Sequence, residues 1–352
     1  MTNKTLLCLP LISLLSHVAL AQTTVVAGVV NGVLNPTQFF GSDIGTQINT
    51  AWASGKGTTV KIPYGTYSFS TTINHPGAGY ELECDAGTVL QYTGSGDAIV
   101  LPNGNPASAQ AAGIDGSGGC QLEGNASAKS GIHLTPSNHT FVRNMRIAGF
   151  SNGYGIYITG ANSVDISDNS ITGNQTGIYL TNSTYNGSGY AANAIHVNHN
   201  EIASNSTWGL DSEPGSCACT ENLGVAIIEN VFEGDGVGDV NLNWNRGTNV
   251  EGNYFESSGI EVQIGSTTNS WGTAVRSNYF TTSSSVTEAV SIGYGVQFDI
   301  TDNSEIGNTL TGCFINITAG TNGGSFTHRG IGTNYSTSTN EWCNHGVGTT
   351  SP

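Results

Sequence analysis

The sequence is poor in charge, and above all in positive charge. Its 352 residues include nine Lys plus Arg against 25 Asp plus Glu, a net charge of −16, and charged residues form only 10% of the chain, where about a quarter is usual. Nine cations cannot build the basic surface that neutralises a phosphate backbone, so nucleic acid is excluded as a partner. The shortage of Glu and Lys also excludes long charged helices and coiled coils.

Small polar residues and an ordinary share of hydrophobic residues take the place of the charges. There are 49 glycines, and 37% of the residues are hydrophobic and 8% aromatic. That hydrophobic content excludes intrinsic disorder, which needs low hydrophobicity and high net charge. We expect a globular chain of one or two domains.

The N-terminus reads as a secretory signal. Lys4 provides the positive charge, residues 6–15 are almost entirely apolar, and Ala19-Leu20-Ala21 forms an A-x-A cleavage site. The apolar run is shorter than the roughly 20 residues of a membrane-spanning helix. We therefore expect a cleaved signal peptide at 1–21 and a secreted, extracellular or periplasmic protein at 22–352, with no membrane attachment after cleavage.

Six cysteines remain after cleavage of this signal: Cys84, Cys120, Cys217, Cys219, Cys313 and Cys343. An even number in an exported chain indicates disulfides, whose connectivity the sequence leaves open. The cysteines contain no C-x-x-C pair, which disfavours metal binding by thiolates. We predict no metal site and no required cofactor.

The middle of the chain repeats. The pattern apolar-x-x-Asn-x-apolar, first seen at 166–171, recurs with asparagines 23 to 31 residues apart at Asn169, Asn200, Asn230, Asn253 and Asn278, and in a weaker copy at Asn303. An asparagine at the same turn of successive coils can bond its counterpart in the next coil, as in other asparagine ladders. Ordinary turn preference is the alternative explanation.

A second repeat is a short alternating strand, usually opened by glycine. Copies start at Gly131, Gly155, Gly177 and Gly209, and weaker ones at Asp239, Gly259, Ala289 and Phe314. No long stretch between the copies has helical periodicity, which disfavours a sheet with crossover helices. Short strands stacked in coils of this length predict a parallel β-solenoid whose inward Ile, Val, Leu and Phe form a continuous core.

An amphipathic helix is predicted before the first coil. Apolar residues at 44, 48, 51 and 52 lie on one helical face, and the helix would cover the strand edges at the open end of the stack. Strands follow at 60–62 and 67–69.

The run from Asp43 through Ile62-Pro63-Tyr64-Gly65-Thr66-Tyr67 resembles the N-terminal cap and first coil of the pectate lyase and rhamnogalacturonase/epimerase-like group of the pectin-lyase-like superfamily. The resemblance implies an all-β fold: a single-stranded right-handed parallel β-helix (a solenoid) with a short N-terminal capping helix. The cap would span about 38–57, the coils about 58–320 and a C-terminal tail about 321–352, all in one domain. It also implies action on polysaccharides at the outer face of one parallel sheet, although the fold hosts non-catalytic proteins as well.

The outward residues of the glycine-opened strands form two columns when the strands are aligned. The alignment places Asp211 and Glu261 two coils apart in the first column, roughly 9–10 Å along the axis, with Glu213 beside Asp211. This approaches the carboxyl separation of about 6.5–9.5 Å in inverting glycosidases. Asp211, Glu213 and Glu261 are therefore the predicted catalytic residues.

Aromatic and amide side chains near these acids are the predicted substrate-binding residues. Aromatic rings can stack on sugars and amides can bond hydroxyls; the set is His133, Tyr157, Tyr179, Asn241, Asn243, Gln263, Trp208 and Trp244. The long insertions 182–190 and 214–223 would wall a cleft over the central coils. A solvated sheet face without a function is the alternative.

A second candidate pair is Glu233 and Glu256, each three residues after a ladder asparagine on adjacent coils. Carboxylates stacked about 5 Å apart would suit a retaining glycosidase or, with Glu229 or Asp235, a calcium site. Splayed surface glutamates are the alternative, because like charges in register repel each other.

The reaction class follows from the charge. A lyase needs a base and a cation to neutralise a uronate, whereas a hydrolase needs only paired acids. We therefore favour a glycoside hydrolase that acts on a neutral or weakly charged polysaccharide or oligosaccharide. A pectate-type lyase dependent on Ca²⁺, and a non-catalytic carbohydrate-binding or surface β-helix, stay open as alternatives, and the sequence leaves the oligomeric state open.

Overall fold

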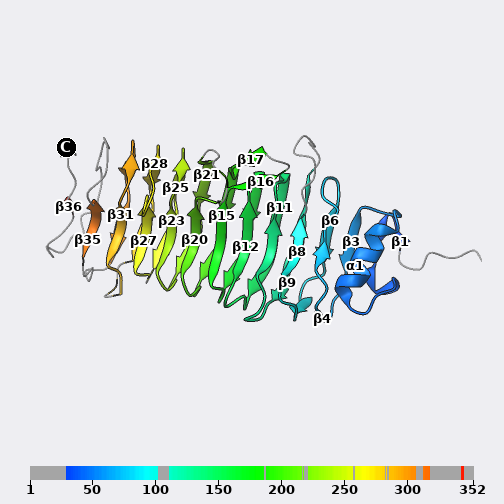
Figure 1. Ribbon diagram of the computed structural model, residues 1–352. Coiled ribbons are helices and arrows are strands. Elements are labelled where there is room, and N and C mark those ends of the chain that lie inside the picture. The colour runs from blue at the N-terminus through cyan, green and yellow to red at the C-terminus, as the bar shows by residue number, and fades with distance from the viewer. Residues whose placement is uncertain are drawn as a thin grey trace, which may run out of the picture.

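The computed structural model describes residues 29–101, 111–185, 188–215, 217, 221–256, 258–281, 283, 285–306, 312–317 and 342–344. The predicted signal peptide at 1–21, Cys219, and the tail after 320 apart from 342–344 lie outside these residues. The described chain winds into a long stack of coils with the helix at its N-terminal end (Figure 1). No helix in the described part is long and apolar enough to span a membrane.

One side of the stack is an 11-stranded sheet of parallel strands. In chain order it contains β5 (Ile73–Asn74), β8 (Asp97–Leu101), β10 (Ser130–Leu134), β12 (Tyr154–Thr159), β15 (Thr176–Thr181), β20 (Trp208–Glu213), β23 (Gly238–Leu242), β27 (Ile260–Ile264), β31 (Glu288–Ile292), β35 (Cys313–Ile317) and β36 (Trp342–Asn344). The pairing of β36 with β35 extends the stack into the segment that the sequence analysis assigned to a tail.

The remaining sides belong to a 23-stranded sheet. One row contains β3 (Thr59–Ile62), β6 (Glu81–Cys84), β9 (Ala112–Glu123), β11 (Asn138–Ala148), β13 (Asn162–Ser167), β18 (Asn193–Asn198), β21 (Asn222–Ile228), β25 (Asn249–Glu251), β29 (Ala274–Arg276) and β33 (Asp299–Thr301). A second row contains β4 (Thr66–Phe69), β7 (Val89–Tyr92), β14 (Ser170–Thr172), β19 (Glu201–Ala203), β22 (Val231–Glu233), β26 (Tyr254–Glu256), β30 (Tyr279–Thr281) and β34 (Ser304–Ile306). Short strands β24 (Asn245–Arg246), β28 (Ser270–Trp271) and β32 (Gly295–Val296) line one corner.

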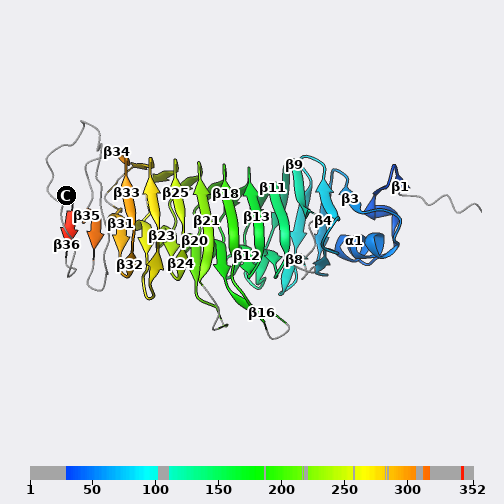
Figure 2. The same cartoon turned by 90° about the horizontal axis from the view of Figure 1, so that it is seen from above.

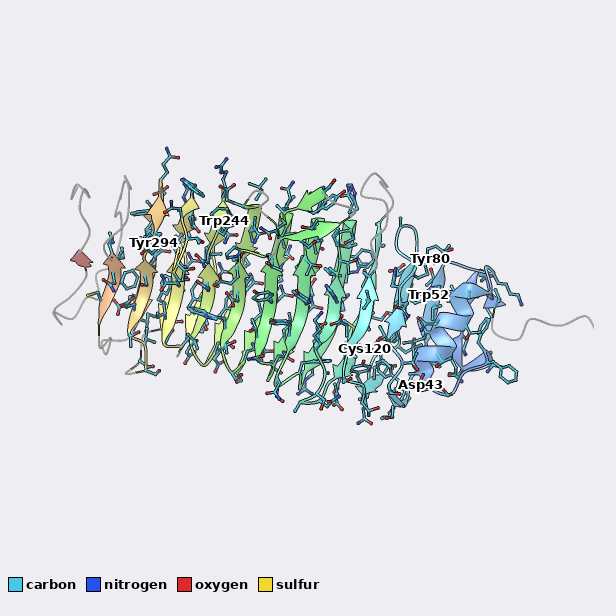
Figure 3. The ribbon with its side chains drawn as sticks, in the orientation of Figure 1. Asp43, Trp52, Tyr80, Cys120, Trp244 and Tyr294 are labelled. Atoms are coloured by element: carbon cyan, nitrogen blue, oxygen red, sulfur yellow. A yellow bond between two sulfur atoms is a disulfide. The ribbon has the colours of Figure 1, made fainter. Side chains whose placement is uncertain are left out.

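The helix α1 (Ile44–Ala53) covers the end of the stack, as the sequence predicted (Figure 3). Its buried side includes Ile48 and Trp52. Asp43 caps its N-terminus through the Thr46 amide at 2.8 Å, and the other oxygen of the same carboxylate accepts the Ser70 amide at 2.9 Å. Burial opposes ionisation, but these backbone hydrogen bonds outweigh it and lower the pKa of Asp43 to about 2. The strands β1 (Val29–Val30) and β2 (Val33–Leu34) and the 3₁₀ turn Pro36–Gln38 precede the helix.

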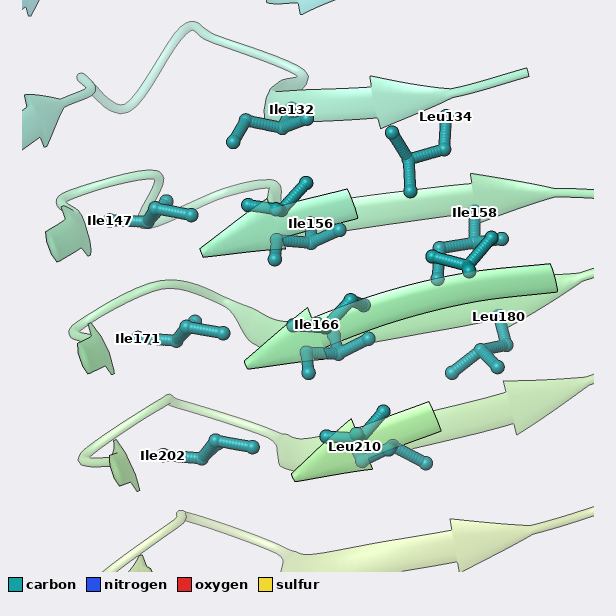
Figure 4. Packing of buried hydrophobic residues seen from close by; sticks show 14 of the residues in the cluster. Ile132, Leu134, Ile147, Ile156, Ile158, Ile166, Ile171, Leu180, Ile202 and Leu210 are labelled. Carbon is teal, nitrogen blue, oxygen red and sulfur yellow. The ribbon is translucent and has the colours of Figure 1, made fainter. Parts of the chain in front are cut away.

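The interior is a continuous stack of aliphatic and phenyl side chains. Figure 4 shows the same inward positions repeating from coil to coil, such as Ile132, Ile156 and Leu210. Further along, the rings of Phe232, Phe255 and Phe280 stack at 5.3 and 5.0 Å. Burial of such side chains contributes roughly 1.5–3 kcal/mol each, so the core is the main source of stability.

The asparagine ladder is present as predicted. In each step the Nδ2 of one asparagine donates to the Oδ1 of the next at 2.9 to 3.0 Å, and the backbone N–H donates to the same oxygen; the members are Asn169, Asn200, Asn230, Asn253, Asn278 and Asn303. All six are buried. The ladder satisfies backbone groups at a buried turn that would otherwise lack partners.

A second buried ladder was not predicted. Asn174 bonds Asn205, Asn205 bonds Asp235, and the Asp235 amide donates to Ser258 Oγ at 3.0 Å. This ladder lies at the corner before the 11-stranded sheet, and it changes residue type from amide to acid to hydroxyl along the stack.

The disulfide prediction is confirmed for the first pair of cysteines. Cys84 and Cys120, from β6 and β9, are bonded to each other in the core. Cys217 and Cys313 each take part in a disulfide as well. Disulfides are typical of proteins that are exported to an oxidising compartment.

Candidate functional site

A groove of about 280 Å³ lies on the outer face of the 11-stranded sheet. Three predicted site residues line it together, namely Tyr179, Trp208 and Asp211. Other lining residues are Tyr154, Gln175, Thr176, Thr207 and Val237. An aromatic-walled groove with one carboxyl group is the form that sugar-binding sites and other small-molecule sites commonly take.

Asp211 and Glu213 form an acid pair on the exposed side of β20. The Nδ2 of Asn241, on the next coil, donates to Asp211 Oδ1 at 2.8 Å and to Glu213 Oε1 at 2.9 Å. Two oxygens bound to one nitrogen are no farther apart than the sum of these distances, 5.7 Å. The amide therefore holds the two carboxyl groups next to each other.

The surroundings of Asp211 favour its protonated form. Burial raises the pKa of Asp211 to about 7, the hydrogen bond from Asn241 opposes the shift, and the nearby negative charge of Glu213 adds to it. A carboxyl group that keeps its proton near neutral pH can act as a general acid.

Asn243 fixes the second carboxylate. Its Nδ2 donates to Glu213 Oε2 at 2.7 Å, while its Oδ1 accepts the Thr268 amide at 2.8 Å. Asn241 and Asn243 are both almost fully buried. The sequence predicts that these amides bond sugar hydroxyls, whereas in the structure they bond the two carboxyl groups of the acid pair.

A cluster of stacked rings continues the groove along the sheet. The Tyr154 ring stacks on Tyr179 at 4.6 Å between centroids, and Tyr157 stacks on His133 at 4.4 Å. Tyr154 and Tyr157 are 4.9 Å apart. The predicted residues Tyr179, Tyr157 and His133 thus lie together on neighbouring coils, in one cluster with Tyr154. Tyr154 was not predicted, although it directly precedes a strand-opening glycine, as Trp208 does.

His133 is held by an aspartate that was also missed. Asp97 Oδ2 is 2.9 Å from His133 Nδ1, and its Oδ1 accepts the Ser130 hydroxyl at 2.7 Å. Burial opposes ionisation of Asp97, but the hydrogen bonds from His133 and Ser130 keep its pKa below the usual value. Lys129 Nζ lies 5.1 Å from the centre of the Tyr157 ring, which places a cation at this end of the cluster.

The prediction for Glu261 was wrong. Asn241 pairs with Gln263, so Gln263 takes the place in the first column that the sequence analysis gave to Glu261. Glu261 instead pairs laterally with Asp239 and is 0% exposed. The prediction started this strand at Gly259, whereas Glu261 is the residue in register with Gly177, Gly209 and Asp239, so the predicted alignment was shifted by two residues at this coil.

Glu261 belongs to a buried acid cluster with Asp235 and Asp239. A side chain added at Gly209 would clash with Asp235 Oδ2, which indicates that this column faces the second ladder. Asp239 and Glu261 turn into that corner, and the Ser258 hydroxyl donates to Asp239. Burial raises the pKa of Asp235 to about 9 and that of Glu261 to about 7, and it raises that of Asp239 as well.

Trp244 and the insertions lie at the edge of the same sheet. Trp244 follows Asn243 and contacts Trp271 rather than the groove. The first insertion forms a hairpin of β16 (Ser183–Tyr185) and β17 (Ser188–Tyr190), which projects beyond the sheet that carries β12 and β20 (Figure 2). Gly215, in the second insertion, packs against Asn182. The two insertions thus meet beside the C-terminal ends of β15 and β20, the second of which carries the acid pair.

The second candidate pair is in register as predicted. Glu233 pairs with Glu256 on adjacent strands β22 and β26. Glu233 is exposed, and Glu256 accepts the Tyr254 hydroxyl. Asp235, suggested as a further calcium ligand, is buried in the second ladder instead. The pair lies on the 23-stranded sheet, away from the groove.

The fold defines a class: the protein is a right-handed parallel β-helix of the pectin-lyase-like superfamily. Residues 69–288 match the family described as NosD, periplasmic copper-binding protein, and the chain belongs to that family. Membership of a periplasmic family confirms the predicted export. No curated protein sequence matches the chain.

Solved structures share the fold at low sequence identity. A DFA-IIIase from Arthrobacter chlorophenolicus A6 in complex with DFA-III is 16% identical with a TM-score of 0.64, covering 88% of this chain and 86% of its own. The catalytic unit of a GH87 α-1,3-glucanase from Streptomyces thermodiastaticus strain HF3-3 is 13% identical with a TM-score of 0.56, covering 91% and 72%. PfbA, a surface adhesin of Streptococcus pneumoniae, is 14% identical with a TM-score of 0.54, covering 86% and 87%.

Proposed function

We propose that this protein is a glycoside hydrolase that cleaves a neutral glycan at the acid pair Asp211 and Glu213. The observation that carries the proposal is the single Asn241 amide that holds both carboxyl groups within 5.7 Å of each other, oxygen to oxygen. Retaining glycosidases use two carboxyl groups about 5–5.5 Å apart, whereas inverting enzymes need room for a water between them. The spacing therefore favours retention, not the inversion expected from the sequence.

The two acids would divide the chemistry by their surroundings. Asp211, whose pKa is about 7, donates its proton to the glycosidic oxygen as that bond breaks. Glu213, held by Asn241 and Asn243, attacks the anomeric carbon and forms a glycosyl ester. Asp211, now ionised, takes a proton from water, which attacks the same carbon and releases Glu213.

The groove and the net charge support a neutral glycan as the substrate. Tyr154, Tyr179 and Trp208 offer ring faces that can pack against sugar C–H groups beside Asp211. A net charge of −16 repels polyuronates. Among the solved structures of the same fold are a DFA-IIIase and a GH87 α-1,3-glucanase, so the scaffold is compatible with this chemistry.

Copper, which the family description names, does not fit the side chains that the structure describes. In the described residues no three His, Cys, Asp or Glu side chains come together in a way that could hold a metal ion. Both ring nitrogens of His133 are already hydrogen-bonded, one to Asp97 and the other to Thr159. We therefore derive no step through copper.

Incubation with a panel of polysaccharides, with and without EDTA, tests the proposal. We expect new reducing ends from a neutral glycan, unaffected by EDTA and lost in Asp211→Asn and Glu213→Gln. Glu233→Gln and Glu256→Gln are the matched controls and should keep full activity. Unsaturated, ultraviolet-absorbing products would instead favour the lyase, and full activity of Glu213→Gln would refute the site.

A further inference from the structure

A second aromatic surface lies at the corner that follows the 11-stranded sheet. The rings of Trp244 and Trp271, from adjacent coils, meet edge to face at 6.2 Å between centroids. The Arg246 guanidinium lies 5.4 Å from the centre of the Trp271 ring. Tyr294, two coils beyond Trp244 in the same column, is 41% exposed. Figure 3 shows Trp244 and Tyr294 along the same edge of the stack.

The backbone of Trp244 is in an unfavourable conformation for its residue type. Its φ is +64°, in the left-handed region that glycine and asparagine adopt most readily. A bulky side chain there costs free energy, and such strain is concentrated at ligand sites and active sites.

This surface is linked to the acid pair through the buried Asn243. Asn243 donates to Glu213 Oε2 at 2.7 Å, and Trp244 is the next residue along the chain. Successive coils are about 4.8 Å apart, so the column from Trp244 to Tyr294 extends by roughly 10 Å. That length is comparable with a disaccharide unit laid along the stack.

The charge of the surface also matches a neutral ligand. Arg246 is 3.4 Å from Glu221, which balances its charge. What remains exposed is indole and phenol surface, which packs against the C–H faces of sugar rings. A phosphate or a uronate would need an unpaired cation here.

We infer that Trp244, Trp271 and Tyr294 form an aromatic platform for the polysaccharide that is cleaved in the groove. The platform binds sugar units of that polysaccharide that lie beyond the groove. This inference rests on the proposed function for the identity of the ligand. The platform makes the protein selective for long chains, because a short oligosaccharide fills the groove without reaching it.

Three variants and a matched control test the platform. Trp244→Gly relieves the backbone strain, and Trp271→Ala and Tyr294→Ala remove the other rings. Tyr64→Ala is the control, since Tyr64 is 75% exposed and lies between β3 and β4, in the first coil. Binding is measured by calorimetry in the Asp211→Asn background, using the polysaccharide that gives product or, if none does, each soluble neutral glycan of the panel.

We expect each ring removal to weaken binding of the long chain up to about ten-fold, which is the size of one aromatic contact. A short oligosaccharide of the same linkage should bind all variants equally, and Tyr64→Ala should bind like the parent. Equal loss for long and short ligands, unchanged binding, or no binding of any glycan would overturn the platform. Binding that depends on Trp244 in a protein without hydrolytic activity would support the platform while refuting the proposed hydrolase.

Discussion

The buried acid cluster makes stability depend on pH in an unusual direction. Asp235, Asp239 and Glu261 are almost fully buried, and burial raises the pKa of Glu261 to about 7. Between the ordinary value of about 4.5 and this raised value, the native protein keeps a proton on Glu261 that the unfolded chain has lost. The contribution of Glu261 to stability is therefore fully present below its ordinary pKa and is lost as the pH rises through this range, the opposite of a salt-bridged carboxylate.

The magnitude follows from proton linkage. Each carboxyl group that stays protonated only in the native state lowers the free energy of unfolding by about 1.4 kcal/mol for each unit by which the pH rises. For Glu261, the interval from pH 5 to pH 7 corresponds to a loss of about 2–3 kcal/mol. The substitution Glu261→Gln keeps the shape of the protonated acid and removes the ionisation.

Denaturant unfolding at pH 5, 6, 7 and 8 measures this effect. We expect Glu261→Gln to have about the parent stability at pH 5 and to exceed it by about 2–3 kcal/mol at pH 7. Glu233→Gln, at an exposed position, should follow the parent at every pH. A stability difference between Glu261→Gln and the parent that does not change with pH would refute the reasoning.

Three further predictions concern the ladder, the cap and the acid pair. Asn253→Ala, which removes hydrogen bonds to Asn230 and Asn278 at a buried turn, should cost about 3–5 kcal/mol, measured by denaturant unfolding; a cost under 1 kcal/mol would contradict the ladder's role. Asp43→Ala should lower the free energy of unfolding by about 1–2 kcal/mol, and unchanged unfolding would contradict the capping assignment. Hydrolysis should decline as the pH rises through about 7, because Asp211 loses the proton that it donates; a rate that stays constant to pH 9 would exclude Asp211 as the general acid.

The sequence predicted the parts of the fold that repeat with a fixed residue type. The first ladder has asparagine on six successive coils, in five of them between two apolar residues, and its members are bonded as expected. The capping helix was predictable because the apolar residues at 44, 48, 51 and 52 have helical spacing. The second ladder escaped because it uses Asn174, Asn205, Asp235 and Ser258 in turn.

The candidate site was predicted in part, and the failure has a physical cause. Asp211 and Glu213 were correctly placed on the outer face, because alternation along a strand fixes which side chains point outward. Glu261 was misplaced because glycine was used to align the strands. Alignment of the inward residues Val240 and Val262 gives the observed register, since the core constrains register more strongly than a corner residue does. Asp97 could not be predicted as the partner of His133, because the two residues are far apart in the sequence and come together only in the folded structure.

The measurement that tests the central claim most directly is the configuration of the first product, followed by nuclear magnetic resonance during cleavage of the active glycan. Two carboxyl groups held by one amide at Asn241 predict that the anomeric configuration is retained and that Glu213→Gln releases no product. Inversion of configuration, or product release by Glu213→Gln at the parent rate, would contradict the account.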